Sequence, residues 1–74
     1  MLFHTFVKRK YLNDSSCKGS LARGFKSESK YFSGRMLGYQ RYLAFLELKG
    51  ASLEVINVFN ECWKEWEDFE RKTD

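Results

Sequence analysis

The stretch YQRYLAFLELKGASLEVINVFNECWKEW, residues 39–66, indicates two helices joined by a tight turn. The first helix has the apolar stripe of an amphipathic helix, with side chains at i, i+3, i+4 and i+7: Tyr39, Tyr42, Leu43 and Leu46. Gly50 stands where a helix ending in the left-handed conformation needs a glycine. Ser52 can then cap a second helix, which we predict over residues 53–71.

The second helix has a broader apolar face than the first. Its main positions are Leu53, Ile56, Phe59, Trp63 and Trp66. They recur at helical spacing, so one side of a long helix is expected to pack against the rest of the chain. The acidic side chains between them are expected to form its solvated face.

The first half of the chain has weaker signals. Apolar residues at helical spacing predict a helix over residues 1–11, and a polar run predicts a loop over residues 12–20. Ser20 is the expected N-cap of a short helix that ends near Lys30. The connection that follows contains two glycines and is expected to be anchored to the core by Phe32.

These elements predict an all-α fold, a small four-helix bundle that forms a single domain over residues 1–74. A chain of 74 residues is too short for two hydrophobic cores. Its 13 aromatic side chains must provide much of the buried area. The expected core consists of Phe3, Phe6, Val7, Leu21, Phe25, Phe32, Tyr39, Leu43, Leu46, Leu53, Ile56, Phe59, Trp63 and Trp66.

The charges are divided unevenly along the chain. Residues 1–37 carry eight basic and two acidic side chains, a net charge of +6, whereas residues 38–74 carry five basic and eight acidic ones, a net charge of −3. The overall charge of +3 therefore conceals a dipolar chain. The charges can be solvated helix faces, a basic surface that attracts phosphate, or an electrostatic contact with a protein or a second copy.

The composition argues against several classes of protein. The apolar start, residues 1–7, is followed by a basic run, which reverses the order of a signal peptide, and no window is long and apolar enough to span a bilayer. We therefore expect a cytoplasmic protein with no membrane contact and reduced cysteines. His4 is expected at the surface or boundary of its helix, and Cys62 as an inert packed thiol.

We expect no enzymatic activity, no cofactor and no metal. One histidine and two separated cysteines do not provide the ligands of a structural zinc site. The glycine-containing run at residues 19–27 has the wrong spacing for a phosphate-binding loop, and no strand precedes it. A core of this size also leaves little room for the roughly 300 Å³ of a small-molecule pocket.

One part of the sequence interleaves basic and aromatic residues, the combination that neutralises phosphates and stacks bases on single strands. For Phe32 we favour anchoring in the core, whereas Tyr31 is a candidate for stacking. Together with the basic run of the first helix, this segment gives the candidate residues for binding nucleic acid or another partner: Lys8, Arg9, Lys10, Lys26, Lys30, Tyr31 and Arg35.

The order of these landmarks resembles the YozE-type SAM-like family of small bacterial and phage proteins. The resemblance covers about residues 3–69, and its most specific parts are Leu46-Glu47-Leu48 and the segment from Phe59 to Trp63. It implies a four-helix bundle similar to sterile alpha motif domains, encoded by a bacterium, a phage or a mobile element. It implies no established reaction.

Three functions are compatible with these features. The first is a non-catalytic module that binds nucleic acid through its basic half. The second is a protein interaction module in which the basic half of one copy docks on the acidic last helix of the next. The third is an inhibitor of a host protein.

Overall fold

The computed structural model describes residues 1–32 and 37–72, which form only helices and the turns between them. The five helices of these residues are α1 (Phe3–Tyr11), α2 (Cys17–Ser27), α3 (Ser29–Phe32), α4 (Tyr39–Leu48) and α5 (Leu53–Lys72). The all-α fold class is therefore confirmed. None of these helices combines the length and the apolar composition needed to cross a bilayer.

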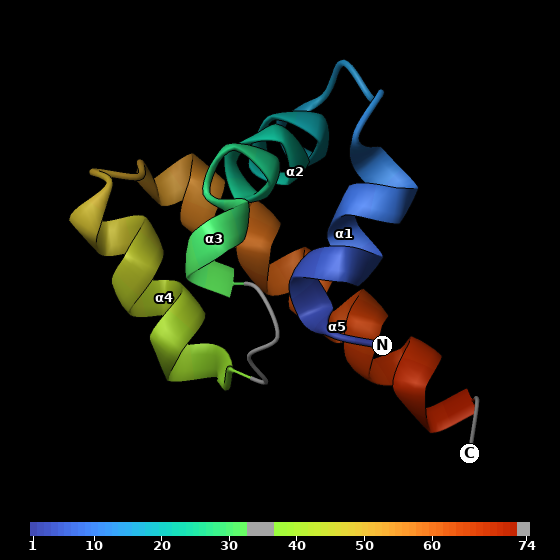
Figure 1. Ribbon diagram of the computed structural model, residues 1–74. Helices are drawn as coiled ribbons and strands as arrows, with labels where there is room; N and C mark the ends of the chain where they lie inside the picture. The colour runs from blue at the N-terminus through green and yellow to red at the C-terminus, as the bar shows by residue number, and fades with distance from the viewer. Residues whose placement is uncertain (33–36, 73–74) are drawn as a thin grey trace.

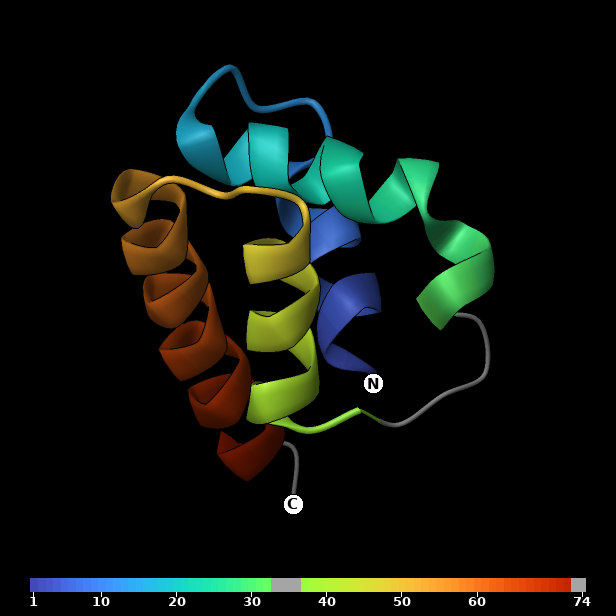
Figure 2. The ribbon, with the colours of Figure 1, turned by 90° about the vertical axis from the view of Figure 1, so that its left-hand side faces the viewer.

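The helices form a small bundle around the long α5 (Figure 1). α4 and α5 lie side by side and run in opposite directions, with α2 across the end where the α4–α5 turn lies (Figure 2). α1 packs against both α2 and α5, and so connects the start of the chain to its last helix.

The first half of the chain differs from the sequence prediction in two places. α2 begins at Cys17, three residues before the predicted cap, because the Ser16 side chain accepts a hydrogen bond from the Lys18 backbone N–H at 3.2 Å. Ser20 therefore lies inside α2, and its assignment as the N-cap is wrong. The segment before Phe32 is a short helix of its own, α3, which the sequence did not indicate.

The turn between α4 and α5 confirms both predicted signals. Gly50 has a φ of 76°, a left-handed conformation that side chains with a Cβ rarely adopt. The Gly50 N–H donates to the Glu47 carbonyl and the Ala51 N–H to the Leu46 carbonyl, both at 3.0 Å, which completes a Schellman motif. The Ser52 hydroxyl then accepts from the Val55 N–H at 3.3 Å and caps α5.

The core is a cluster of aromatic rings centred on Phe3 of α1. Its ring contacts five others, with centroid distances from 4.8 to 5.9 Å: Phe25, Tyr42, Phe59, Trp63 and Trp66. Most of these pairs meet edge to face, the arrangement that aromatic quadrupoles favour. One residue of α1 therefore joins α2, α4 and α5.

Most of the predicted core residues are buried or partly buried, with one exception and four additions. Leu53 is 74% exposed at the start of α5, so its assignment to the core is wrong. Ala22, Tyr42, Phe45 and Cys62 are buried, although the predicted core did not include them. On α4 the buried face passes through Phe45, and Leu43 is only partly covered.

His4 is buried, with 5% of its surface exposed, and the prediction that it lies at the surface or boundary of α1 is wrong. Its ring stacks on Phe32 at a centroid distance of 5.4 Å. Neither ring nitrogen has a hydrogen-bond partner among the described residues. Burial, together with the positive charge of Lys8, lowers the pKa of His4 from its usual value of 6.5.

This burial makes the stability of the fold depend on pH. The unfolded chain binds a proton at His4 near pH 6.5, whereas the folded chain binds it only at lower pH. The contribution of neutral His4 to the free energy of unfolding is therefore complete above pH 6.5 and decreases as the pH falls below 6.5. We expect the free energy of unfolding to decrease between pH 6.5 and 5. The variant His4→Phe keeps a ring on Phe32, and denaturation with urea should show little pH dependence in this range. An equal slope in the variant would contradict this role of His4.

Two glycines of α2 have opposite surroundings. A Cβ at Gly19 would collide with the backbone carbonyl of Asp14. The backbone of the loop before α2 can therefore lie this close to residue 19 only because that residue has no side chain. A Cβ at Gly24 would have no atom within 4 Å. Gly24 is therefore not required by packing, although glycine in a helix interior costs about 0.5–1 kcal/mol relative to alanine.

The same substitution should have opposite effects at these two sites. Gly24→Ala is expected to stabilise the protein by about 0.5–1 kcal/mol through helix propensity. Gly19→Ala is expected to destabilise it by about 1–3 kcal/mol, because the loop backbone must move. Thermal unfolding followed by circular dichroism measures both changes, and effects of the same sign would contradict the close approach at Gly19.

Candidate functional site

The basic side chains of the first half fall into two groups, those with carboxylate partners and those without. The main partner is Glu65 of α5, which accepts from Lys18 at 2.7 Å, from Lys10 at 3.3 Å and from the Tyr11 hydroxyl at 2.5 Å. This cluster ties α1 and α2 to α5. The sequence had indicated that the acidic side chains of α5 form a solvated face. In the structure, Glu65 also binds donors from α1 and α2.

The charges of this cluster stabilise one another. Partial burial alone would raise the pKa of Glu65, but the hydrogen bonds from Lys18 and Tyr11 outweigh it and hold that pKa below its usual value. The hydrogen bond to Glu65 raises the pKa of Lys18 in turn. Lys10 was a candidate for partner binding from the sequence, but its ammonium is already held by Glu65 and lies over the rings of Phe6 and Tyr11.

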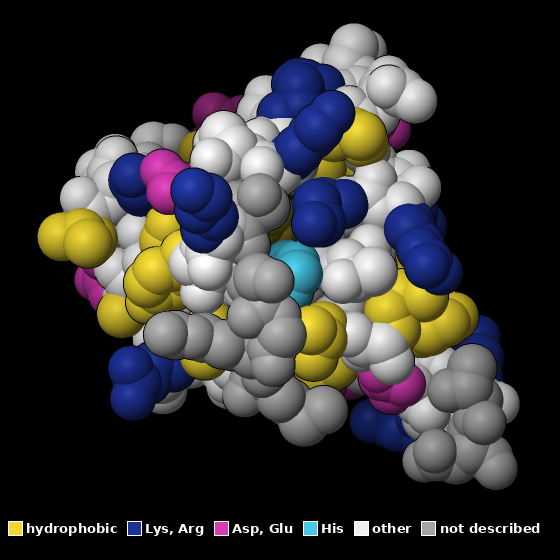
Figure 3. Space-filling view, in the orientation of Figure 1, with side chains coloured by type: hydrophobic (Ala, Val, Ile, Leu, Met, Phe, Trp, Pro, Cys, Tyr) yellow, Lys and Arg dark blue, Asp and Glu magenta, His cyan; other side chains and the backbone are white. Residues whose placement is uncertain are grey.

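The second group has no such partners. Among the described residues, no carboxylate lies within ion-pair distance of Lys8, Arg9, Lys26 or Lys30. Lys and Arg side chains gather over α1 and α2 around the one histidine, and acidic side chains lie mainly towards the edges of this view (Figure 3).

An open hollow of about 520 Å³ adjoins this group, lined by Leu12, Asn13, Arg23, Lys26 and Ser27. The Arg23 guanidinium donates to the carbonyls of Leu12 and Asp14, at 3.2 and 2.9 Å, and so fixes the loop that forms one wall. Arg9 and Lys8 belong to the last turn of α1, whose C-cap Leu12 lines this hollow. The charge of Lys8 contributes to the lowered pKa of His4.

We call Lys8, Arg9, Arg23, Lys26 and Lys30 the basic face. Arg23 had not been selected as a binding residue from the sequence, although it lies three residues before Lys26 in the same helix, a spacing that places both side chains on one face. A guanidinium and an ammonium at one hollow can hold a phosphate from two sides, since both are hydrogen-bond donors with a positive charge.

The other two sequence candidates are Tyr31, which follows Lys30 of the basic face, and Arg35. Tyr31 is 41% exposed, and its ring stacks on Phe45 at 5.4 Å and meets Phe32 edge to face at 5.0 Å. It is therefore partly a packing residue. Arg35 lies outside the described residues. The burial of Phe32 confirms its expected role as a core anchor.

The expected lack of space for a small-molecule pocket is wrong. Besides the hollow at Arg23, a second open groove of about 420 Å³ lies between α2, α4 and the start of α5. The two cysteines are not bonded to each other, since Cys17 is exposed and Cys62 is buried. Burial raises the pKa of Cys62 to about 11, which keeps its thiol protonated and inert as predicted.

Comparison with known proteins gives no family for this chain. No known protein family matches it, and no curated protein or solved structure matches it significantly. The resemblance to the YozE-type family stays a prediction, and function has to be argued from the residues of this chain.

The Glu65 cluster predicts a difference between two neighbouring carboxylates. Glu65→Gln should destabilise the protein by about 1–2 kcal/mol, because three donors lose a charged acceptor. Glu61→Gln is the matched control, since Glu61 is mostly exposed and its carboxylate lies 3.9 Å from the Lys18 ammonium, so its loss should cost at most about 0.5 kcal/mol. Urea denaturation of both variants at pH 7 tests this, and equal losses would contradict it.

Proposed function

We propose that this chain is a non-catalytic module that binds nucleic acid through the basic face. The observation that carries the proposal is how the described cations of the first half divide: Lys10 and Lys18 are neutralised by Glu65, whereas the five of the basic face have no carboxylate within ion-pair distance among the described residues. Such charges repel one another, and a polyanion relieves that repulsion.

The contacts available favour the phosphate backbone over base edges. Three of the five cations of the basic face are lysines, which act on phosphates as mobile point charges. The hollow at Arg23 and Lys26 is open and shallow, which suits a backbone that passes over it. Tyr31, next to Lys30 on α3, offers a partly exposed ring for stacking. We therefore propose binding with little sequence preference.

A fold of the SAM-like type and an origin in a bacterium, phage or mobile element belong to the same proposal, as the resemblance of residues 3–69 implies. A cytoplasmic location would give such a module access to nucleic acid.

Head-to-tail association through opposite charges has less support. It would require the carboxylates of α5 to be available to a second copy. Glu65 is held by Lys10 and Lys18, and the Glu70 carboxylate lies 2.9 Å from the amino group of Met1. The acidic helix is thus partly neutralised within its own chain.

Binding to a labelled single-stranded oligonucleotide tests the proposal. At about 50 mM salt we expect micromolar affinity that decreases as salt rises, because each neutralised phosphate releases counterions. The double variant Lys26→Glu and Lys30→Glu should bind at least about tenfold more weakly. The slope of log K against log salt should fall by about 0.7 for each phosphate that the variant no longer neutralises.

The matched control is the double variant Lys64→Glu and Lys72→Glu. Both lysines are exposed on α5, and the substitutions change the net charge of the chain by the same amount. Binding should change much less than in the first variant. Equal losses would show attraction by net charge alone, and no binding by the unmodified protein at micromolar concentration would overturn the proposal.

A further inference from the structure

His4 is a buried titratable group among the cations of the first half. The space-filling view shows its ring with Lys and Arg side chains around it (Figure 3). Only 5% of its surface is exposed, and its two ring nitrogens have no hydrogen-bond partner among the described residues. The neutral ring can remain there stacked on Phe32, whereas a charged ring in the same place needs a negative charge nearby.

The surroundings of His4 oppose a positive charge on its ring. His4 is the second residue of α1, near the positive end of the helix dipole, and the first turn of α1 contains no acidic residue. Lys8 lies one turn later on the same helix, and its charge disfavours the charged ring. The backbone of Phe32 favours the charged ring, but burial and Lys8 have the larger effect, so the pKa of His4 is lowered.

The helices that pack near His4 add a neutral group and further cations. On α4, the Tyr42 hydroxyl accepts a hydrogen bond from the His4 backbone N–H at 3.4 Å. Burial raises the pKa of Tyr42 to about 12, so this hydroxyl stays neutral at any physiological pH. The helices α2 and α3 contribute three cations of the basic face: Arg23, Lys26 and Lys30.

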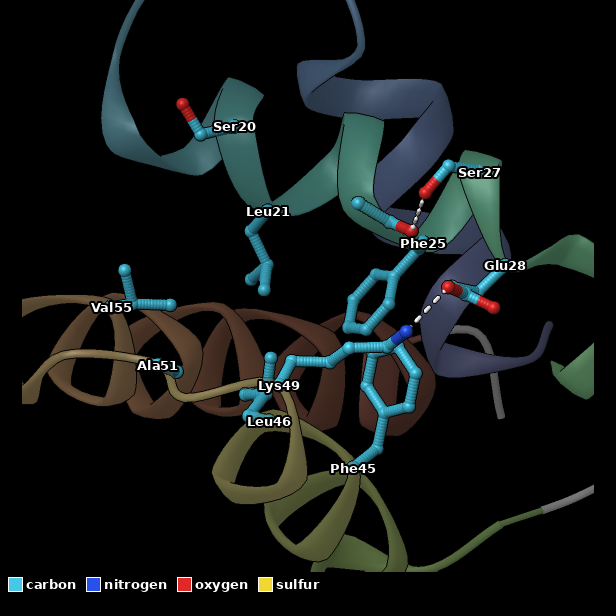
Figure 4. A pocket seen from close by; sticks show the side chains of 11 residues that line it. Ser20, Leu21, Phe25, Ser27, Glu28, Phe45, Leu46, Lys49, Ala51 and Val55 are labelled. Atoms are coloured by element: carbon cyan, nitrogen blue, oxygen red, sulfur yellow. Dashed lines mark hydrogen bonds and ion pairs between the residues drawn. The ribbon is translucent and has the colours of Figure 1, made fainter.

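Carboxylates of the neighbouring elements are held by other groups. Glu28, at the end of α2, lies 2.7 Å from the Lys49 ammonium (Figure 4). On α5, Glu65 is held by two lysines, and Glu70 accepts from the amino group of Met1. Among the described residues, no carboxylate is one of the charges that change the pKa of His4. A negative charge that favours protonated His4 therefore has to come from a ligand.

We propose that nucleic acid on the basic face is bound together with a proton on His4. Lys8 links the two sites, because it belongs to the basic face and its charge also acts on His4. Phosphates over the basic face offset the charge of Lys8 and add negative charge near the ring, and both effects favour the protonated form. Because linkage is reciprocal, the proton strengthens binding by the same factor. This inference rests on the proposed function and adds a dependence on pH to it.

An NMR titration of His4 tests the coupling directly. His4 is the only histidine of the chain, so its ring signals are identified without ambiguity. In the free protein we expect its pKa to lie below 6.5. A saturating amount of single-stranded oligothymidylate, whose bases do not titrate near neutral pH, should raise the pKa of His4 by at least about 0.5.

The affinity for the same oligonucleotide should depend on pH. At about 50 mM salt, the dissociation constant should be at least about twofold lower at pH 5.5 than at pH 7.5. The variant His4→Phe keeps a ring on Phe32 but cannot take up a proton, so its affinity should differ little between these two pH values. Circular dichroism at both pH values checks that each protein is folded.

A change at Lys8 tests the proposed link. In Lys8→Gln the pKa of His4 in the free protein should rise towards 6.5, because one of the two causes that lower it is removed. The oligonucleotide should then raise this pKa less than in the unmodified protein. Lys64→Gln is the matched control, since it removes the same charge at an exposed position on α5, and His4 should titrate as in the unmodified protein.

Two results would overturn this inference alone. One is binding of the oligonucleotide at pH 7.5 with no rise in the pKa of His4. The other is a His4→Phe variant whose affinity depends on pH as strongly as that of the unmodified protein. Absence of binding at every pH would instead overturn the proposed function, and the coupling with it, so the two failures are distinguishable.

Discussion

The packing of Phe3 against five aromatic rings is the interaction on which the rest of the structure depends. Phe3 lies almost at the start of the chain, and three of its partners, Phe59, Trp63 and Trp66, lie on the last helix. A chain of 74 residues has a high ratio of surface to volume, so large rings are an effective way to bury enough area. The contacts between these rings determine how α1, α2 and α4 are placed along α5.

The packing of α1 also affects which cations have a carboxylate partner. α1 packs against both α2 and α5, and its basic run divides: Lys10 reaches Glu65, whereas Lys8 is close enough to His4 to lower its pKa. The net charge of the first half is therefore a poor guide to its surface. Of the seven described cations of the first half, two have a carboxylate partner, and the five of the basic face have none within ion-pair distance among the described residues.

The parts of the fold that local signals determine were predictable from sequence. The α4–α5 turn depends on Gly50 and Ser52, whose roles involve only neighbouring backbone, and both predictions are confirmed. The cap of α2 was mistaken because Ser15, Ser16 and Ser20 have the same local chemistry, and only the structure shows that the Ser16 side chain accepts from the Lys18 N–H. Similarly, periodicity placed Leu53 on the apolar face of α5, but at the first residue of that helix the side chain is 74% exposed.

The candidate site was only partly predictable, since it depends on contacts between distant segments. Sequence composition identified Lys8, Arg9, Lys26 and Lys30, but it could not show that Glu65 neutralises Lys10 or that the loop at residues 12–13 forms a hollow with α2. The burial of His4 was missed for a related reason, because a single polar residue in an apolar helix gives no sign of which neighbour covers it. The fold around it, with Phe32 stacked on its ring, provides that information.

The position of the two tryptophans has a spectroscopic consequence. Trp63 and Trp66 are the only tryptophans of the chain, their rings lie 4.9 Å apart, and both contact Phe3. Their fluorescence therefore reports on the meeting of the first helix with the last, the contact that joins the most distant parts of the sequence. During refolding, a change in tryptophan emission would therefore time the closure of the longest loop in the chain. Local helix formation alone would change this emission very little.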